Sequence, residues 1–187
     1  MTTVSEAIRP ESETPVLRVR DLRTHFFTSQ GAVKSVDGVN LEVFQGETLG
    51  IVGESGSGKS VTALSVMRLI ASPPGQIVSG QIELGGEDLL TFDAAAMRRI
   101  RGRRISMIFQ DPLASLNPVL RIGFQLGEVF RHHLGLDGKR AESEAVRMLR
   151  AMDIPSPETR ARSYPHQLSG GMRQRAMIAM ALSCKPE

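Results

Sequence analysis

Eight residues, GESGSGKS at positions 53–60, constrain the fold of this chain more than any other stretch. They fit the pattern G-x-x-x-x-G-K-[S/T], in which a strand leads into a glycine-rich loop and a helix leaves it. The flanks agree, because ETLGIVG (47–53) has the pattern of a short apolar strand and KSVTALSVMRLIA (59–71) that of a helix. This context predicts an α/β core with a phosphate-binding loop, called here the phosphate loop (53–60).

The residue types of the phosphate loop suit the phosphates of a nucleotide. Its glycines permit backbone angles and a close approach that a Cβ would prevent, so successive N–H groups can form a concave anion site. Lys59 would place its charge between the β- and γ-phosphates, and the Ser60 hydroxyl is a hard oxygen suited to Mg²⁺. The alternative is a loop that only turns a strand into a helix. We expect ATP and Mg²⁺ to be bound by Gly53, Ser55, Gly56, Gly58, Lys59, Ser60 and Val61.

A second segment, LSGGMRQR (168–175), stands just before another helical pattern and is called here the signature segment. Ser169, Gly170 and Gly171 would bring a hydroxyl and two small residues to a helix N-terminus, where free N–H groups attract anions. One nucleotide rarely needs two such termini more than a hundred residues apart in one chain. An ATP held between two chains explains both segments, whereas the alternative is that Ser169 is an ordinary N-cap.

Composition limits the other possibilities. The 187 residues allow one core domain, alone or with a small satellite, and the net charge of +3 is too small to indicate a nucleic-acid partner. A single cysteine excludes an internal disulfide and fits a reducing compartment. The N-terminus lacks the apolar stretch of a signal peptide, and no run approaches the roughly 20 apolar residues of a spanning helix. We therefore expect any membrane role to depend on a partner.

Periodicity and turn residues give a coarse order of elements. Residues 1–15 have the composition of a disordered tail. Alternating patterns predict strands in VLRVRDL and VKSVDGVNLEVFQGE and a hairpin at 79–89. Further expected elements are a helix at 93–104, a strand at 104–112, helical structure at 122–152, a loop at 155–165 and a helix after the signature segment.

GESGSGKS, MIFQDP (107–112) and LSGGMRQR, in this order, resemble the nucleotide-binding subunit of an ATP-binding cassette (ABC) transporter. The resemblance covers residues 16–187, as a partial ABC ATPase domain. It implies an α/β fold, a P-loop NTPase core of the ABC ATPase type, with an N-terminal antiparallel β subdomain and an inserted helical subdomain near 113–165. It also implies a head-to-tail dimer, in which the phosphate loop of one subunit and the signature segment of the other clamp each ATP.

The resemblance assigns roles to two further residues. Gln110 matches the family's Q-loop glutamine, which reaches Mg²⁺ and the attacking water, so Gln110 and Lys59 are the expected catalytic residues, and Ser60 and Gln110 the expected metal ligands. Without that match, a glutamine at a strand end is usually a turn residue. Phe26 matches the aromatic residue that stacks on adenine, although Phe26 or Phe27 could equally belong to a strand core.

The stretch DPLASLNPVLRIGFQLGEVFRHH (111–133) resembles the dipeptide, oligopeptide and nickel importer branch of the family. KSVTALSVMRL and the final segment also resemble the ATPase of the glutathione importer. This resemblance implies integral membrane permease subunits, a second ABC ATPase domain and, indirectly, a solute-binding protein as partners. It also implies a peripheral position on the cytoplasmic face of the inner or plasma membrane. It does not name the cargo, and no nucleic acid is expected.

In this family the strand after the signature helix ends in Asp-Glu, and a histidine follows later. The sequence reaches Glu187 before that strand, so we expect a fragment with an incomplete central sheet and little hydrolysis. One alternative function is a soluble ABC-type ATPase acting on DNA or ribosomes. The other is a nucleotide-binding remnant that does not hydrolyse ATP.

Overall fold

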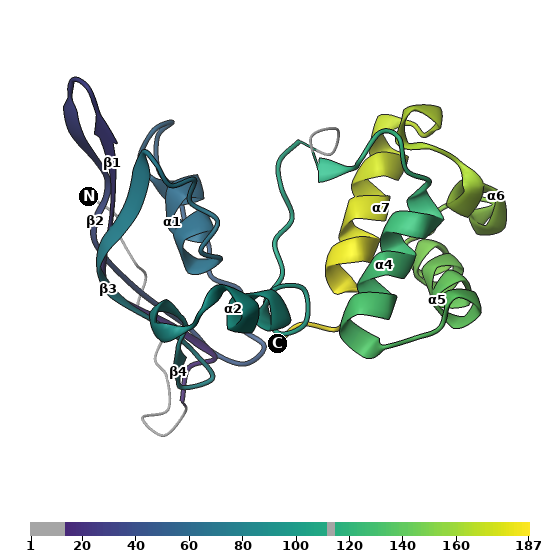
Figure 1. Cartoon of the computed structure of the whole chain (residues 1–187), viewed down its shortest axis with the longest axis horizontal. Coiled ribbons are helices and arrows are strands. Elements are labelled where there is room, and N and C mark those ends of the chain that lie inside the picture. The colour runs from purple at the N-terminus through teal and green to yellow at the C-terminus, as the bar shows by residue number, and fades with distance from the viewer. Residues whose placement is uncertain (1–13, 112–114) are drawn as a thin grey trace. The chain divides into compact units, whose positions relative to one another are not determined.

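The computed structural model describes residues 14–111 and 115–187. Contacts divide the chain into two compact units, with the division between Met97 and Arg98, and Figure 1 shows the elements of both. Most of the predicted tail, residues 1–13, lies outside the described residues. Among the described residues, no helix combines the length and the apolar character needed to cross a membrane.

The first unit is built on an antiparallel sheet of order β2-β1-β3-β4. The two long N-terminal strands and the hairpin near 79–89 are confirmed. The β1–β2 turn lies at Ser29–Gln30, as the glycine after them suggested, and Gly85–Gly86 connects β3 to β4. The strands are β1 (Leu17–Thr28), β2 (Gly31–Val43), β3 (Gly75–Leu84) and β4 (Glu87–Asp88).

Helix α1 (Lys59–Val66) lies against one face of this sheet (Figure 1). The hydroxyls of Thr24 on β1 and Ser65 on α1 share a hydrogen bond of 2.8 Å, and both residues are fully buried. The side chain of Leu22, two residues before Thr24, is buried too, whereas Arg23 between them is paired with Asp21 on the more exposed side. This two-residue alternation is what places α1 over one face only.

Helix α1 is shorter than predicted, because it ends at Val66 and not at residue 71. Arg68 adopts a left-handed φ of 50°, and the N–H of Leu69 donates to the carbonyl oxygen of Leu64 at 2.8 Å. The Arg68 guanidinium donates to the carbonyls of Leu89 and Phe92. The C-terminus of α1 is therefore fixed by a contact with residues more than twenty positions later in the sequence. Two short helices follow, η1 (Leu89–Thr91) and α2 (Ala94–Ile100), and α2 is shorter than the predicted 93–104.

Two predicted strands, 47–53 and 104–112, are wrong for the described residues. Residues 47–53 form no strand, and 104–111 contribute only an isolated bridge between Arg101 and Ile105. An extended segment needs neighbouring strands to pair its backbone groups, and neither segment borders the sheet described above. Their apolar side chains are consequently exposed, at 44% for Ile51, 77% for Val52, 47% for Ile108 and 41% for Phe109.

The second unit is helical, and its core lies among four helices that bury Leu126, Leu149, Ile154, Ala176 and Ala179. The predicted helical stretch at 122–152 is confirmed as two helices separated at Gly135, whose φ of 65° is left-handed. The predicted loop at 155–165 is wrong in part, because it contains a short helix that starts at a proline. The elements are α4 (Ile122–Leu134), α5 (Gly138–Ala151), α6 (Pro157–Arg162), η2 (Pro165–Gln167) and α7 (Gly170–Leu182).

The loop before α4 is held from inside by the buried side chain of Gln125. Its amide oxygen accepts from the Asn117 N–H at 2.9 Å, and its amide nitrogen donates to the carbonyls of Asn117 (3.0 Å) and Leu120 (2.9 Å). One side chain therefore replaces three backbone partners in a loop without regular structure. The loop displays Val119, which is 75% exposed.

Candidate functional site

The phosphate loop is organised around the ammonium group of Lys59, the first residue of α1. Lys59 Nζ donates to the carbonyl oxygens of Gly53 and Glu54, both at 2.7 Å, and lies 3.3 Å from the Ser57 hydroxyl. An ammonium group has three donors, and these three oxygens match them. The loop thus curls around a positive charge at the N-terminus of a helix, where an anion is stabilised.

Gly58 is required by the fold of the loop itself. It is the N-cap of α1, with a left-handed φ of 89°. A Cβ at this position would lie 2.3 Å from the carbonyl oxygen of Ser35 on β2, a distance that no side chain tolerates. Gly56 also has a left-handed φ, of 82°, but space around it is open. Glycine is thus needed at Gly58 for both angle and space, and at Gly56 for the angle alone.

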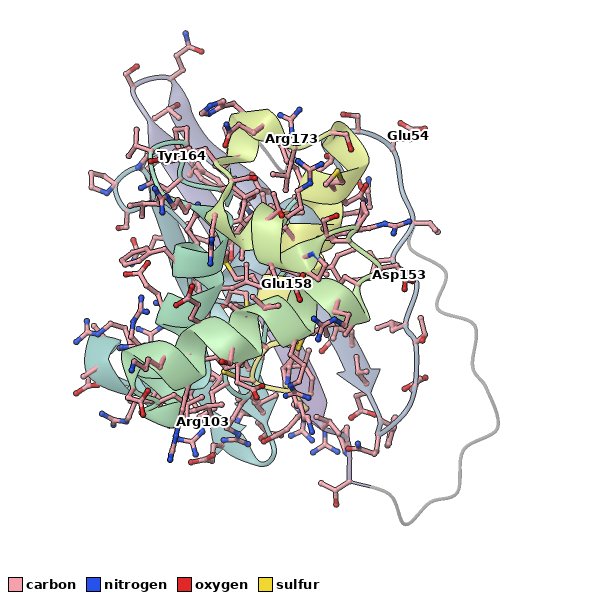
Figure 2. The ribbon with its side chains drawn as sticks, turned by 90° about the vertical axis from the view of Figure 1, so that its right-hand side faces the viewer. Glu54, Arg103, Asp153, Glu158, Tyr164 and Arg173 are labelled. Atoms are coloured by element: carbon pink, nitrogen blue, oxygen red, sulfur yellow. The ribbon has the colours of Figure 1, made fainter. Side chains whose placement is uncertain are left out.

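The predicted nucleotide ligands of the phosphate loop are accessible. Gly53, Ser55, Gly56 and Ser60 are exposed, and Lys59 and Val61 are half-buried. Ser60 lies in the first turn of α1, where backbone N–H groups have no partner within the helix. Figure 2 shows the neighbouring Glu54 side chain at the outside of this loop. The loop therefore presents an open set of donors rather than an enclosed cavity.

The signature segment opens helix α7 as predicted. Ser169 is its N-cap, in extended geometry, and the Ser169 hydroxyl accepts a hydrogen bond from the Met172 N–H at 3.3 Å. Gly170 and Gly171 are exposed and have no left-handed φ. A Cβ added to either would meet no described atom within 4 Å. Nothing in the described part of this chain therefore requires glycine at these two positions.

Gln110 and Phe26 belong to different units. Gln110 is exposed at a bend in the second unit, and the three residues that follow Asp111 lie outside the described residues. Phe26 is half-buried on β1, with its ring against Gly75, whereas the next residue, Phe27, is 51% exposed. The roles of Gln110 in catalysis and of Phe26 in adenine stacking remain predictions.

The structure thus brings the predicted residues of the two motifs together in two groups, one at the start of α1 and one at the start of α7. Phe26 and Gln110 belong to neither group. Sequence reasoning missed Ser57, whose hydroxyl completes the partners of Lys59, although its place inside the motif was a signal. It also missed Arg175, whose guanidinium donates to the carbonyl of Asp153, just beyond the end of α5. No local pattern could have shown that contact, because the partner carbonyl is 22 residues away.

A cavity of about 610 Å³ lies elsewhere in the second unit, beside the ends of α4 and α7. It is lined by none of the predicted site residues. Cys184 is one of its walls, and burial raises the pKa of this thiol, opposed by the charge of Arg103.

Comparison with known proteins decides the family. The sequence matches the family described as ABC transporter over residues 36–187. The chain belongs to the ABC transporter family. The matched range contains the whole of the phosphate loop and of the signature segment, so both motifs stand within the family's own pattern.

Curated relatives of this ABC chain share about half of its residues. The "Probable peptide ABC transporter ATP-binding protein y4tR" of Sinorhizobium fredii is 50% identical over 92% of this chain and 51% of its own length. The "Oligopeptide transport ATP-binding protein AppD" of Bacillus subtilis is 48% identical over 92% of this chain and 52% of its own length. The chain spans about half the length of the curated relatives it matches.

Solved structures support the same ABC fold. The chain is similar to the cassette described as "Dimeric Structure of MJ0796, a Bacterial ABC Transporter Cassette", with a TM-score of 0.78 and 24% identity. The match covers 91% of this chain and 70% of that cassette. A second structure of the same cassette, described as bound to ADP and Pi, gives a TM-score of 0.79. The predicted α/β fold of the ABC ATPase type is therefore confirmed.

Proposed function

We propose that this chain binds Mg-ATP and is the ATP-binding part of a subunit that drives peptide import through a membrane ABC transporter. The single observation that carries the proposal is the phosphate loop, in which three oxygens converge on Lys59 at the start of α1. The relatives support the branch, because their names describe ATP-binding proteins for peptide and oligopeptide transport.

The residues present fit the phosphates of ATP. Gly58 keeps the loop close against Ser35, and N–H groups of the exposed loop residues would bind the phosphate oxygens. The Lys59 ammonium would join them by exchanging a loop oxygen for a phosphate oxygen. The Ser60 hydroxyl, exposed in the first turn of α1, would hold Mg²⁺. The Gln110 amide is the second predicted ligand of the ion. The ion would neutralise charge on the phosphates. Gln110 would orient water, and Phe26 would stack on the adenine.

The second half of the nucleotide site would come from another ATPase domain, either a second copy or a paralogous subunit. The support is that Gly170 and Gly171 are small without a reason inside the described chain, as expected where another molecule must approach closely. The free N–H groups at the start of α7 and the Ser169 hydroxyl would then contact the phosphates bound by the partner.

Hydrolysis coupled to transport would require membrane partners. We infer contacts with integral membrane permease subunits and indirect cooperation with a solute-binding protein, on the cytoplasmic face of the inner or plasma membrane. Di- and oligopeptides are the favoured cargo, before glutathione or nickel. An ATPase acting on DNA or ribosomes is disfavoured, because the relatives named above are peptide transport proteins.

The first test replaces Lys59 by alanine and titrates the chain with a fluorescent ATP analogue in the presence of Mg²⁺. Losing charge-assisted hydrogen bonds should weaken binding by about tenfold or more. Lys139→Ala, an exposed lysine at the start of α5, is the matched control and should bind as the unchanged chain does. Equal affinity of Lys59→Ala and the unchanged chain would refute the assignment of the phosphate loop.

A turnover assay then separates the proposal from its non-hydrolysing alternative. Release of phosphate from Mg-ATP that disappears in Lys59→Ala would show hydrolysis at this loop. ATP binding without any turnover would instead favour a nucleotide-binding module.

A further inference from the structure

Arg175, in the second turn of α7, makes a polar contact that the proposed function does not use. Its guanidinium Nη1 donates to the carbonyl oxygen of Asp153 at 2.9 Å and is 3.4 Å from that of Met152. The other side-chain hydrogen bonds described on α7, made by Ser169 and Ser183, stay within the helix or its caps. Arg175 therefore links α7 to the end of α5 through directional hydrogen bonds.

The end of α5 is a place where a cation is favoured. The N–H groups of Met152, Asp153 and Ile154 turn back to the carbonyls of residues 148, 150 and 149, which satisfies those three acceptors. Asp153 takes a left-handed φ of 52° to make this turn. The carbonyls of Met152 and Asp153 lie beyond it, at the negative end of the helix dipole, and Arg175 reaches both.

The apolar contacts between the two helices differ in kind from this link. The core packs Ala176 and Ala179 of α7 with Leu149 of α5 and with Ile154, and methionines of both helices pack against it. Apolar burial is non-directional, so it opposes separation of the helices more than it fixes their register. A guanidinium with directional hydrogen bonds does resist sliding.

We propose that Arg175 is a positioning residue that fixes the first turn of α7, and with it Ser169 and the two glycines, against the end of α5. Arg173, on the same helix, differs from Arg175 in that its Nε is buried without a hydrogen-bond partner among the described residues. Figure 2 marks Arg173 on α7 and Asp153 beyond α5. The link to ATP rests on the proposed function, whereas the structural role does not.

Hydrogen exchange on the nucleotide-free chain tests the structural role. Arg175→Met keeps an unbranched apolar side chain but removes both hydrogen bonds, so the hydrogen-bonded amides at the start of α7, residues 172–176, should exchange about tenfold faster. Arg175→Lys keeps the charge without the planar fork and should lie in between. The matched control is Arg147→Met, which removes an exposed arginine of α5 paired with Glu144 and should leave α7 unchanged.

Each outcome of the hydrogen-exchange experiment supports or overturns the positioning role of Arg175. Exchange in α7 that is as slow in Arg175→Met as in the unchanged chain overturns the proposal. If Arg175→Met does not fold, as judged by circular dichroism, Arg175→Lys decides in the same way. If amide exchange in α7 is accelerated equally in the Arg147→Met control, the proposal is also overturned, because loss of a positive charge would then explain the faster exchange.

Self-association with Mg-ATP tests the functional consequence. We expect Arg175→Met to bind the fluorescent ATP analogue with unchanged affinity, because the phosphate loop is in the other unit, but to form the ATP-dependent dimer about tenfold less well in sedimentation. If the unchanged chain binds ATP and remains monomeric, the proposed sandwich of two copies fails, while the exchange result still decides the role of Arg175. Dimerisation of Arg175→Met equal to that of the unchanged chain removes the link to ATP.

Discussion

The phosphate loop and the signature segment both contain glycines before a helix, but their glycines are there for different reasons. At Gly58 a side chain would collide with the Ser35 carbonyl at 2.3 Å, and the backbone is left-handed. At Gly170 and Gly171 the space is open and the backbone needs no glycine. The first glycine serves the fold of its own unit, whereas nothing in the described chain requires the other two, which we propose to serve a second chain.

This difference separates two properties that are usually changed together by mutation. A substitution at Gly58 should lower both the stability of the chain and its affinity for ATP. A substitution in the signature segment should leave the ATP affinity of the single chain intact and weaken the step that requires a second chain. Substitutions at Gly58, Ser169 and Gly170 test this distinction.

Gly58→Ala should have the largest effect, lowering the free energy of unfolding by about 2–4 kcal/mol through backbone strain and displacement of β2. Urea unfolding followed by circular dichroism measures it, and the fluorescent ATP titration should show lost binding. Gly46→Ala is the control, since Gly46 has a left-handed φ of 73° but open space. It should cost only about 1 kcal/mol and keep ATP affinity. Equal losses in the two variants would contradict the role of the Ser35 contact.

Ser169→Ala should lower the free energy of unfolding by about 1 kcal/mol, because the Met172 N–H loses its capping partner. The same urea experiment measures it, and Mg-ATP-dependent dimerisation should weaken while ATP affinity of the monomer stays constant. Ser156→Ala is the control, as Ser156 is the N-cap of α6 but makes no capping hydrogen bond. A cost at Ser156 as large as at Ser169 would show that the hydroxyl contact is not the cause.

Gly170→Ala should have the smallest effect on stability, and with the opposite sign. Removing glycine from a helix start with open space should leave the free energy of unfolding unchanged or raise it by up to about 1 kcal/mol. Dimerisation with Mg-ATP should nevertheless fall. Gly138→Ala is the matched control, because Gly138 is likewise the first residue of a helix and has open space. If both variants dimerise normally, Gly170 is not small for the sake of a partner.

Local features of this chain were predictable, and those that depend on distant contacts were not. The phosphate loop and the Ser169 cap follow from neighbouring residues, so sequence patterns located both. The end of α1 at Val66 depends on Arg68 reaching Leu89 and Phe92, which no local pattern records. The apolar segment around Val52 looked like a strand because strands are apolar, but pairing requires neighbours, and it borders none in the described sheet.

The division of the chain between Met97 and Arg98 also divides its charge. Residues 1–97 carry 7 Lys and Arg against 12 Asp and Glu, a net charge of −5, whereas residues 98–187 carry 16 against 8, a net charge of +8. Two copies that meet with the phosphate loop of each opposite the signature segment of the other bring unlike charges together, and two copies that meet in like orientation do not. For the proposed pairing of two copies, long-range electrostatics would therefore favour the head-to-tail encounter before any nucleotide contact forms, and added salt would weaken that preference.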